Sequence, residues 1–362
     1  MTLKNVKNIL FASTRQFNPG DEFILMGTRA VLSSIIGDFN PIIFNRNPEL
    51  IHYEGERVFN FQFNADHFRF KKLLPGRYDN SFKKELLDES FIDLAVFAGS
   101  PGWAAASMRI FYEYLDRHRV PAVFLGIGSS GGRLDVNAFP VLYQKIIKGA
   151  KLITARDEVT VNALAAYQAR YLPCPALLAA PPNAQRKIDS VKKIGLIYET
   201  DKSSKHNRVN HESYIFLLDL YKRLLSEYGK QFDFGFICHY IEEIPECLKD
   251  FPDGACRYSY DAADYIDIYR QFDLVIGPRV HGIGLAASLG IPGISILHDA
   301  RGDTCRGFGA DIVRVGSDID SLFSLLKSKI KNIHNENTSL LQRKNRAFAE
   351  YKALLTPILN PQ

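Results

Sequence analysis

The segment GPRVHGIGLAASLGIPGISI, residues 277–296, is almost long enough and apolar enough to span a membrane, yet it begins with an arginine and a histidine. Its glycines and the Ile-Pro-Gly at 291–293 interrupt any single helix, because proline lacks the backbone donor that a helix needs. The β-branched residues after the proline favour a strand. The segment therefore predicts a turn, a short helix over 282–290 and a buried strand over 293–297, and not a membrane helix.

The same alternation of apolar strand-length runs with helical patterns extends to both sides of this segment. Towards the N-terminus the predicted strands are 8–13, 41–44, 93–99, 121–128, 151–156 and 169–173, and the helices are 21–36, 103–118 and 158–167. Towards the C-terminus the strands are 193–199, 232–240, 273–277, 293–297 and 311–315, and the helices are 211–228, 261–271, 318–330 and 336–355. This order predicts parallel sheets that are buried on both faces.

The stretch 179–193 separates the two series; it is rich in proline and polar residues, has no apolar periodicity and predicts a linker over 183–192. The chain of 362 residues is long enough for two domains of ordinary size. We predict an N-terminal domain over 1–182, a C-terminal domain over 193–335 and a C-terminal helix over 336–362 that packs back on the first domain. Each domain is expected to be a doubly wound, Rossmann-like α/β domain, the two facing each other across a cleft at the carboxyl ends of their strands.

Composition excludes several classes of protein. The net charge of +5 is modest and spread along the chain, so it predicts no nucleic-acid partner and at most transient contact with a membrane surface. The five cysteines form no CxxC pair and no zinc-type spacing, which predicts neither a disulfide framework nor a metal site. The apolar run in MTLKNVKNILFAST at the start is too short for a typical secretory signal, so we expect none, and a reducing cytoplasm is the expected location, including the inner surface of the membrane.

Two glycine-containing motifs lie at strand exits in the first half of the chain. GIGSSG at 126–131 matches a dinucleotide fingerprint literally, but the helix that should follow at once is displaced. Gly128 and Ser129 are better explained as a loop that lets a ligand or a neighbouring loop approach the backbone. GDE at 20–22 has two interpretations: Gly20 turns the chain and Asp21 caps the helix, or the acidic residues contact substrate hydroxyls.

Three arginines and a histidine follow predicted strands. Arg156 in ARDE either pairs with Asp157 or clamps an anion. Arg279 offers a bidentate fork for carboxylate or phosphate at a helix start, and His281 exchanges protons near neutral pH. Arg301 in LHDARGD follows the next strand and should reach the same sheet edge, where His298 and Asp299 either orient the site or are loop residues. Together these cations predict a pocket for a small, multiply charged anion.

The chain resembles the polysaccharide pyruvyl transferase family over most of its length. The resemblance is carried by GDE, AGSPGW, GIGSS, ARDEVTVNAL, CPALL and, most specifically, PRVHGIGLAASLGIPGISI followed by HDARGD. It implies a fold like that of the two-domain GT-B glycosyltransferases. It also implies transfer of a pyruvyl group from phosphoenolpyruvate to hydroxyls of a cell-surface glycan or its lipid-linked precursor, without a cofactor. The N-terminal domain would then serve the acceptor and the C-terminal domain the donor.

By this resemblance Arg279 and His281 match the Arg-x-His of the family, which implies donor binding and catalysis, and Arg156 matches the arginine of its Arg-Asp motif. Two positions depart from the family pattern. Arg301 stands where a lysine is common, and Cys174 stands where an aspartate is usual. We expect His281 to supply a proton, the three arginines to hold the donor charges and Asp21 to act as the base on the acceptor side.

Two other functions remain open from the sequence. The first is a GT-B glycosyltransferase that uses a nucleotide-sugar, for which Glu199 or Asp261 would be the carboxylate that binds the ribose. The second is a non-catalytic sugar- or anion-binding protein, for which Cys174 is the only support. The aromatic stretch 52–68 either stacks on acceptor sugars or packs in the core.

Overall fold

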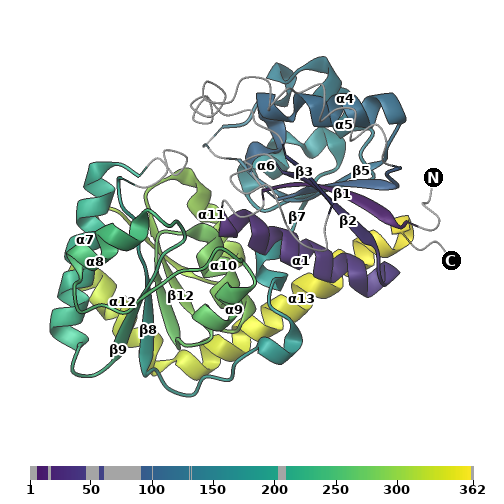
Figure 1. The fold of residues 1–362 in the computed structure, drawn as a ribbon. Coiled ribbons are helices and arrows are strands. Elements are labelled where there is room, and N and C mark those ends of the chain that lie inside the picture. The colour runs from purple at the N-terminus through teal and green to yellow at the C-terminus, as the bar shows by residue number, and fades with distance from the viewer. Residues whose placement is uncertain are drawn as a thin grey trace. The chain divides into compact units, whose positions relative to one another are not determined.

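The chain forms two compact units (Figure 1). The computed structural model describes residues 6–14, 18–45, 57–60, 91–99, 101–129, 131, 133–202 and 209–359. Unit 1 comprises Met1–Pro175 together with Phe348–Gln362, and unit 2 comprises Ala176–Ala347. The units divide at Pro175 and not at residue 182, and the stretch 183–192 lies within unit 2. Helix α13 (Ile333–Leu359) begins in unit 2 and ends in unit 1.

Unit 1 is built on a parallel sheet with the strand order β3-β2-β1-β4-β5-β6-β7. Its strands are β1 (Asn8–Ser13), β2 (Asn40–Asn45), β3 (Arg57–Asn60), β4 (Leu94–Ala98), β5 (Ala122–Ile127), β6 (Leu152–Ala155) and β7 (Arg170–Tyr171). Its helices are α1 (Pro19–Ile36), α4 (Arg109–His118), α5 (Val141–Lys148), α6 (Glu158–Ala163) and the end of α13. The central strands β1, β4 and β5 are almost fully buried, as sheets covered on both faces require.

Aromatic side chains fill the core on one face of this sheet. Phe97 on β4 stacks on Phe124 on β5 with ring centroids 4.1 Å apart. Phe111 on α4 meets Phe97 edge-on at 5.0 Å. Trp103, the single tryptophan of the chain, packs on Phe124 at 5.8 Å and is buried. Such pairs add to the free energy gained by burying apolar area, so they hold α4 and the 3-10 turn Pro101–Ala104 firmly on the sheet.

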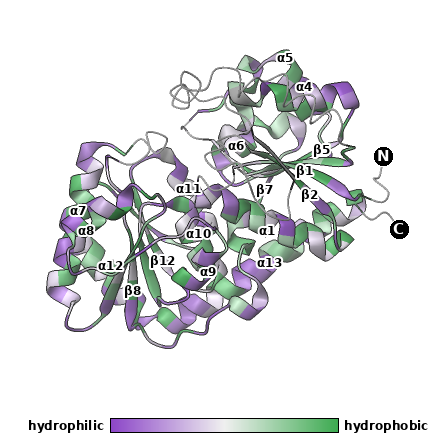
Figure 2. Ribbon diagram, viewed as in Figure 1, coloured by the Kyte–Doolittle hydropathy of each residue, from purple (hydrophilic) through white to green (hydrophobic). Residues whose placement is uncertain are grey.

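Unit 2 repeats the architecture with the strand order β10-β9-β8-β11-β12-β13, again all parallel. Its strands are β8 (Lys193–Ile197), β9 (Asp233–Ile237), β10 (Cys256–Arg257), β11 (Leu274–Gly277), β12 (Gly293–Leu297) and β13 (Asp311–Arg314). Its helices are α7 (His211–Tyr228), α8 (Glu243–Asp250), α9 (Asp264–Tyr269), α10 (Val280–Ser288), α11 (Asp303–Gly307), α12 (Ile319–Lys331) and the start of α13. In Figure 2 strands β8 and β12 are largely hydrophobic, whereas the outer helices α7 and α12 mix hydrophilic and hydrophobic residues.

Helix α10 is buried because its residues are small. A Cβ atom on Gly282 would lie 2.4 Å from the hydroxyl oxygen of Tyr269, and one on Gly284 would lie 2.7 Å from the ring of Phe308. Residues 282–288 are all buried. The glycines therefore let this apolar helix approach its neighbours closely, which explains its composition without a membrane. In the part of the chain that the structure describes, no helix combines the length and the hydropathy that crossing a bilayer would need.

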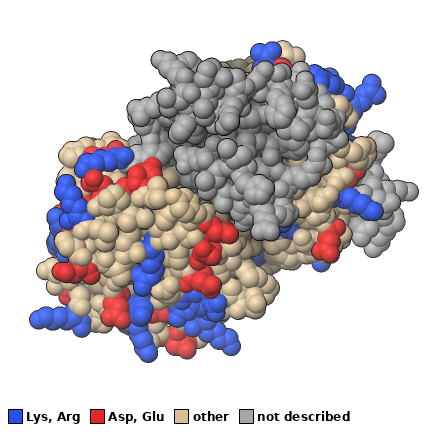
Figure 3. Space-filling model, in the orientation of Figure 1, with Lys and Arg blue, Asp and Glu red and all other residues tan. Residues whose placement is uncertain are grey.

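The prediction of two doubly wound α/β domains with parallel sheets is confirmed. Strands β1 and β12 and helix α7 have the predicted bounds, and most other predicted elements agree to within a few residues. The elements that the sequence pattern missed are short: β3, β10, α5, α8 and α11. On the face drawn in Figure 3, basic and acidic residues of the described chain are interspersed, as the modest net charge suggests.

Candidate functional site

The candidate site in unit 2 lies at the carboxyl edge of its sheet, where the strand order reverses. Among the strands of unit 2, β8 comes first along the chain, but in the sheet it lies between β9 and β11. The connections after β8 and β11 therefore lead away from each other. Ligands of doubly wound sheets bind at this position. Glu199 follows β8 and Arg279 follows β11, and Oε1 of Glu199 lies 3.0 Å from Nη1 of Arg279. An ion pair therefore marks the switch point.

Arg279 is buried between two carboxylates. Its side chain is 9% exposed, and its guanidinium also forms an ion pair with Glu243, whose side chain is fully buried. The guanidinium carbon lies 4.7 Å from the ring centre of Tyr240. Burial alone would lower the pKa of Arg279, but Glu199 and Glu243 raise it well above its usual value. Arg279 thus remains a fixed positive charge inside the protein.

Glu243 is the first residue of helix α8, which follows β9. Its Oε2 accepts hydrogen bonds from the backbone amides of His239, at 2.8 Å, and Tyr240, at 3.1 Å. Burial raises the pKa of Glu243 to about 7, and the neighbouring Glu199 charge adds to this effect, although the Arg279 charge opposes it. Glu243 shares the one guanidinium of Arg279 with Glu199, and its raised pKa brings the gain and loss of its proton close to neutral pH.

Several buried polar atoms of this site make no hydrogen bond within the described residues. They are Oε2 of Glu199, Nε of Arg279 and both ring nitrogens of His298, whereas Oε1 of Glu199 faces Nη1 of Arg279 in the ion pair. His298 follows β12 and is 7% exposed in its side chain, and its Nδ1 lies 3.9 Å from Oε2 of Glu199. A buried polar group without a hydrogen bond costs about 1–3 kcal/mol. A group of such atoms at a sheet switch point is typical of a site that binds a polar ligand.

His281 lies in the first turn of α10, directly after β11, and is half-buried. The next residue, Gly282, packs so closely on Tyr269 and His239 that a Cβ atom would lie 3.0 Å from Cε1 of His239. Burial lowers the pKa of His239 well below its usual value, and the Arg279 charge adds to this effect, so His239 is neutral. The Nε2 of His239 lies 2.9 Å from the Tyr269 hydroxyl. This neutral pair fixes the backbone that carries His281.

Arg301 lies in the 3-10 turn Ala300–Gly302 after β12, which is the neighbour of β11 in the sheet. Its Nε donates to Oδ2 of Asp299 at 2.7 Å, and its backbone amide donates to Oδ1 at 2.9 Å. Burial would raise the pKa of Asp299, but Arg301 lowers it below its usual value. Arg301 therefore lies at the same sheet edge as His281, as predicted from the sequence, and is already paired with an acid.

Arg156 belongs to unit 1, where it follows β6 and is 1% exposed. Its Nη1 lies 3.7 Å from the sulfur of Cys174, the position at which the resemblance leads one to expect an aspartate. A Cβ atom on Gly128 would lie 2.4 Å from Nε of Arg156 and 2.8 Å from Oδ2 of Asp157. The glycine of the GIGSSG loop thus allows a neighbouring loop to approach, as we predicted for this motif.

Asp157 joins the two loops of unit 1. Its Oδ1 accepts from the backbone amide of Thr160, at 2.8 Å, and so caps α6. Its Oδ2 accepts from the backbone amide of Ser129, at 3.1 Å. The side chain of Asp157 is therefore engaged with the backbone at both oxygens, and Ser129 is held at the edge of the sheet next to Arg156.

Asp21 and Gly20 lie in the first turn of α1. The helix is capped by Asn18, whose Oδ1 accepts from the backbone amide of Gly20 at 3.0 Å, so the interpretation in which Asp21 is the cap is wrong. Asp21 is buried, and its Oδ2 accepts from the Thr14 hydroxyl at 3.2 Å.

The structure thus brings Arg279, His281 and Arg301 to one sheet edge in unit 2. Arg156, Gly128 and Ser129 lie together in unit 1, and Asp21 lies at the start of α1. Sequence reasoning missed Glu243, which looks like an ordinary acidic helix start. The stretch 52–68 lies outside the described residues except for strand β3.

Solved structures with the same fold include nucleotide-sugar enzymes. A UDP-GlcNAc 2-epimerase from Neisseria meningitidis bound to UDP-GlcNAc superimposes with a TM-score of 0.53 at 12% identity, covering 98% of this chain and 95% of its own. MnaA from S. aureus in complex with UDP gives 0.54 at 12% identity, covering 91% and 90%. The glycosyltransferase SnogD from Streptomyces nogalater gives 0.54 at 14% identity, covering 97% and 99%. At these identities the similarity shows a shared GT-B-type fold.

Among curated proteins, no sequence matches the chain significantly. A sequence model of a transferase family does match, over residues 18–300, and its description is polysaccharide pyruvyl transferase. The match begins just before α1 and includes the strands from β2 to β12, and with them the Arg-x-His element at the switch point of unit 2. It covers well over half of the chain, and therefore the protein belongs to the polysaccharide pyruvyl transferase family.

Proposed function

We propose that the protein transfers a pyruvyl group from phosphoenolpyruvate to one or two hydroxyls of a sugar, in a cell-surface polysaccharide or its lipid-linked precursor, and releases phosphate. The observation that carries the proposal is the position of Arg279 and His281 at the switch point of unit 2 in a chain of this family. Phosphoenolpyruvate has a carboxylate and a phosphate on one carbon, and cations at the start of a helix suit such an anion.

The reaction needs a proton donor and a hydroxyl that loses its proton. His281 donates a proton to the methylene carbon, which becomes a methyl group, and the neighbouring carbon becomes electrophilic. The sugar hydroxyl adds to that carbon and gives its proton to Asp21. A second hydroxyl then displaces phosphate, which takes up the proton of that hydroxyl, and a ketal closes. Loss of phosphate together with one proton of the new methyl group instead leaves an enol ether. Arg156, Arg279 and Arg301 stabilise the carboxylate and the phosphate during these steps.

The two carboxylates beside Arg279 influence how strongly the pocket would bind an anionic donor. A trianion next to Glu199 and Glu243 is repelled when both are ionised, and less so when Glu243 holds a proton. The Nε of Arg279 makes no hydrogen bond within the described part of the chain and remains a donor for the ligand. The ring of His298 offers a second donor close to Glu199. The pocket would therefore bind the donor together with a proton.

Replacing His281 by alanine tests the proposal. Phosphate release from phosphoenolpyruvate is measured with a panel of sugars that carry paired hydroxyls. We expect the rate to fall by about a hundredfold or more, as for other general acid–base groups. His334→Ala is the matched control, because that histidine is exposed and pairs with Asp189 on the surface. A His281→Ala rate within a few-fold of wild type would refute the assigned role.

Melting shifts distinguish this function from the two alternatives that the sequence leaves open. A ligand that binds only the folded protein stabilises it by about 2.7 kcal/mol at a hundredfold excess over Kd. Phosphoenolpyruvate, UDP, GDP and CMP are compared. A shift with phosphoenolpyruvate alone supports the proposal, and a shift with one nucleotide alone assigns the protein to nucleotide-sugar chemistry, which the fold also accommodates. No shift with any of the four supports a non-catalytic protein.

A further inference from the structure

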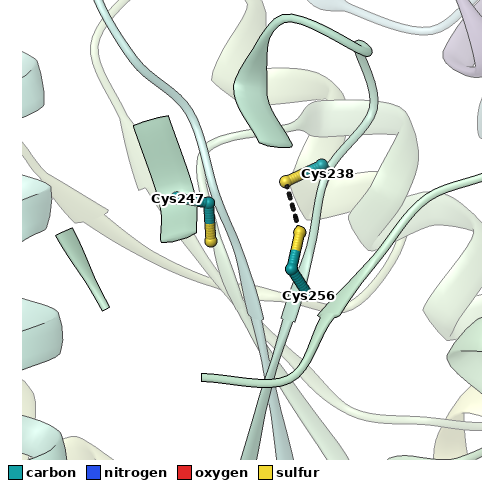
Figure 4. A group of neighbouring side chains, drawn as sticks. All are labelled: Cys238, Cys247 and Cys256. Carbon is teal, nitrogen blue, oxygen red and sulfur yellow. Dashed lines mark hydrogen bonds between the residues drawn. The ribbon is translucent and has the colours of Figure 1, made fainter. Parts of the chain in front are cut away.

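Three cysteines of unit 2 lie together away from the site described above. Cys238 directly follows β9, Cys247 lies on α8 and Cys256 begins β10. Their sulfur atoms all lie within 4.8 Å of one another, and those of Cys238 and Cys256 are 3.2 Å apart. Figure 4 shows the sulfurs of Cys238 and Cys256 facing each other and the Cys247 thiol beside them; the three residues come from a strand end, a second strand and a helix. The spacing of eight intervening residues between successive cysteines fits no zinc motif, so only the fold reveals the cluster.

The backbone around the thiols is held by interactions that do not involve the sulfur atoms. The amide of Cys238 donates to the carbonyl of Arg257 at 2.9 Å, and its carbonyl accepts from the Tyr265 hydroxyl at 2.7 Å. Cys256 is in register with Phe236 on β9. Cys238 and Cys247 are buried, whereas Cys256 is partly exposed. The three ligand atoms are therefore positioned before any ion binds, and one side of the cluster is open to solvent.

The sulfur atoms of Cys238 and Cys256 are in hydrogen-bonding contact, and the basic residue Arg257 follows Cys256 directly in β10. The thiolate is the form of cysteine that binds metal ions. An incoming dication would displace the protons of the three thiols into the solvent, as metal binding at cysteine sites generally releases protons.

The spacing of the sulfur atoms fits an ion held by three thiolates. With Zn–S bonds of about 2.3 Å, sulfurs around a tetrahedral ion are roughly 3.8 Å apart, and around a trigonal ion roughly 4.0 Å. The Cys238–Cys256 separation of 3.2 Å is shorter than these values, and the other two separations are within 4.8 Å. For a tetrahedral ion the sulfurs of Cys238 and Cys256 would have to move apart by about 0.6 Å. A disulfide would use only two of the three thiols and would leave the convergence of the third unexplained.

We propose that Cys238, Cys247 and Cys256 bind one thiophilic metal ion, Zn²⁺, with a water molecule or an added ligand in the fourth position beside Cys256. Cys247 lies one helical turn after Glu243 on α8, so the two side chains share a face of the helix. The ion would tie α8 to the strands and hold Glu243 in place against Arg279. Its role would be to stabilise the site without contact with the substrate.

Cobalt provides the probe, because Co²⁺ bound by thiolates gives an intense sulfur-to-metal charge-transfer band in the near ultraviolet. The full chain is reduced, stripped with a chelator and titrated with Co²⁺ and then with Zn²⁺. We expect one Co²⁺ per chain with this band, and loss of the band when Zn²⁺ displaces it. Metal analysis of the protein purified without chelator should give about one zinc per chain. A titration of wild type without the band, or without one saturable site, would overturn the proposal.

Variants locate the site. Cys256→Ser changes the most exposed ligand and is expected to weaken Co²⁺ binding at least tenfold, with an unchanged far-ultraviolet circular dichroism spectrum. Cys305→Ser is the control, since Cys305 is buried next to the Ser295 hydroxyl, at 3.2 Å, outside the cluster, and should bind like wild type. Unweakened binding by Cys256→Ser would contradict the site. So would a Cys238–Cys256 disulfide, found by mass spectrometry, in unreduced protein that holds no metal.

Discussion

Glu243→Gln tests whether one of the two carboxylates beside Arg279 is protonated in the folded protein. The substitution keeps the size of the side chain but removes its ability to ionise. Burial raises the pKa of Glu243 from 4.5 to about 7. Between these two pH values the unfolded chain loses this proton and the folded protein keeps it, so the folded state binds more protons. The free energy of unfolding contributed by Glu243 must therefore decrease as pH rises from 4.5 to 7.

The size of this effect follows from the same two values. Each factor of ten in proton affinity is worth about 1.4 kcal/mol, so the change from 4.5 to about 7 corresponds to on the order of 3 kcal/mol. Glutamine has no such dependence. The difference in unfolding free energy, wild type minus Glu243→Gln, is then expected to fall by roughly this amount between pH 4.5 and 7 and to stay constant above pH 7.

The assay is urea unfolding of both proteins by circular dichroism at several pH values from 4.5 to 8. Tryptophan fluorescence alone is unsuitable, because Trp103, the single tryptophan, lies in unit 1 and reports on that unit. Glu242→Gln is the matched control, since Glu242 is the preceding residue and is exposed. A difference that does not depend on pH would refute the raised pKa. A difference that rises with pH would mean that the charge of Arg279 outweighs burial.

Three further predictions concern the packing and the binding of the donor. Gly128→Ala should destabilise unit 1 by about 1–3 kcal/mol, because the added methyl group would collide with Arg156. Tryptophan fluorescence reports this unfolding directly, since Nε1 of Trp103 donates to the Gly128 carbonyl at 3.1 Å. Gly131→Ala, which meets no described atom within 4 Å, should leave that unfolding transition unchanged. Gly282→Ala should lower the melting temperature of unit 2, because the added methyl group would lie 2.4 Å from a buried tyrosine hydroxyl. The melting is followed by circular dichroism, and a variant as stable as wild type would contradict the close packing of α10. The affinity for phosphoenolpyruvate, measured by calorimetry, should weaken as pH rises through about 7, because Glu243 beside the bound anion then ionises. An affinity that strengthens over this range would argue against binding of the donor together with a proton on Glu243.

The sheet architecture was predictable from the sequence because buried parallel strands are apolar along their whole length. Strands such as β4 and β12 bury every residue, so their pattern needs no knowledge of the neighbouring strands. Helix α8 was not predictable, because it is short and contains Pro245 and several acidic residues. Strand β10 has only two residues, too few for any pattern.

The site was predictable in part for a related reason. Arginines at strand ends are visible in the sequence, since the strands themselves are visible. Their partners are not: Glu243 is far from Arg279 along the chain, and nothing in its surroundings distinguishes it from a solvated helix start. The approach of Arg156 to Gly128 also depends on how two neighbouring strands end. Such pairings depend on how neighbouring strands align in the sheet. The sequence of a single strand does not contain that alignment.

Helix α13 has a consequence for the order in which the protein is made. Its last turns belong to unit 1, where the hydroxyl of the buried Tyr351 donates to the carbonyl of Pro173 at 2.9 Å, next to the loop that ends at Cys174. On the ribosome, unit 1 begins first, yet it lacks this packing until the residues after Phe348 have emerged. Unit 2 is contiguous and completes its contacts earlier. The half of the protein that is synthesised first is thus finished last, and a fragment that stops at Pro175 would expose the back of the Arg156 loop to water.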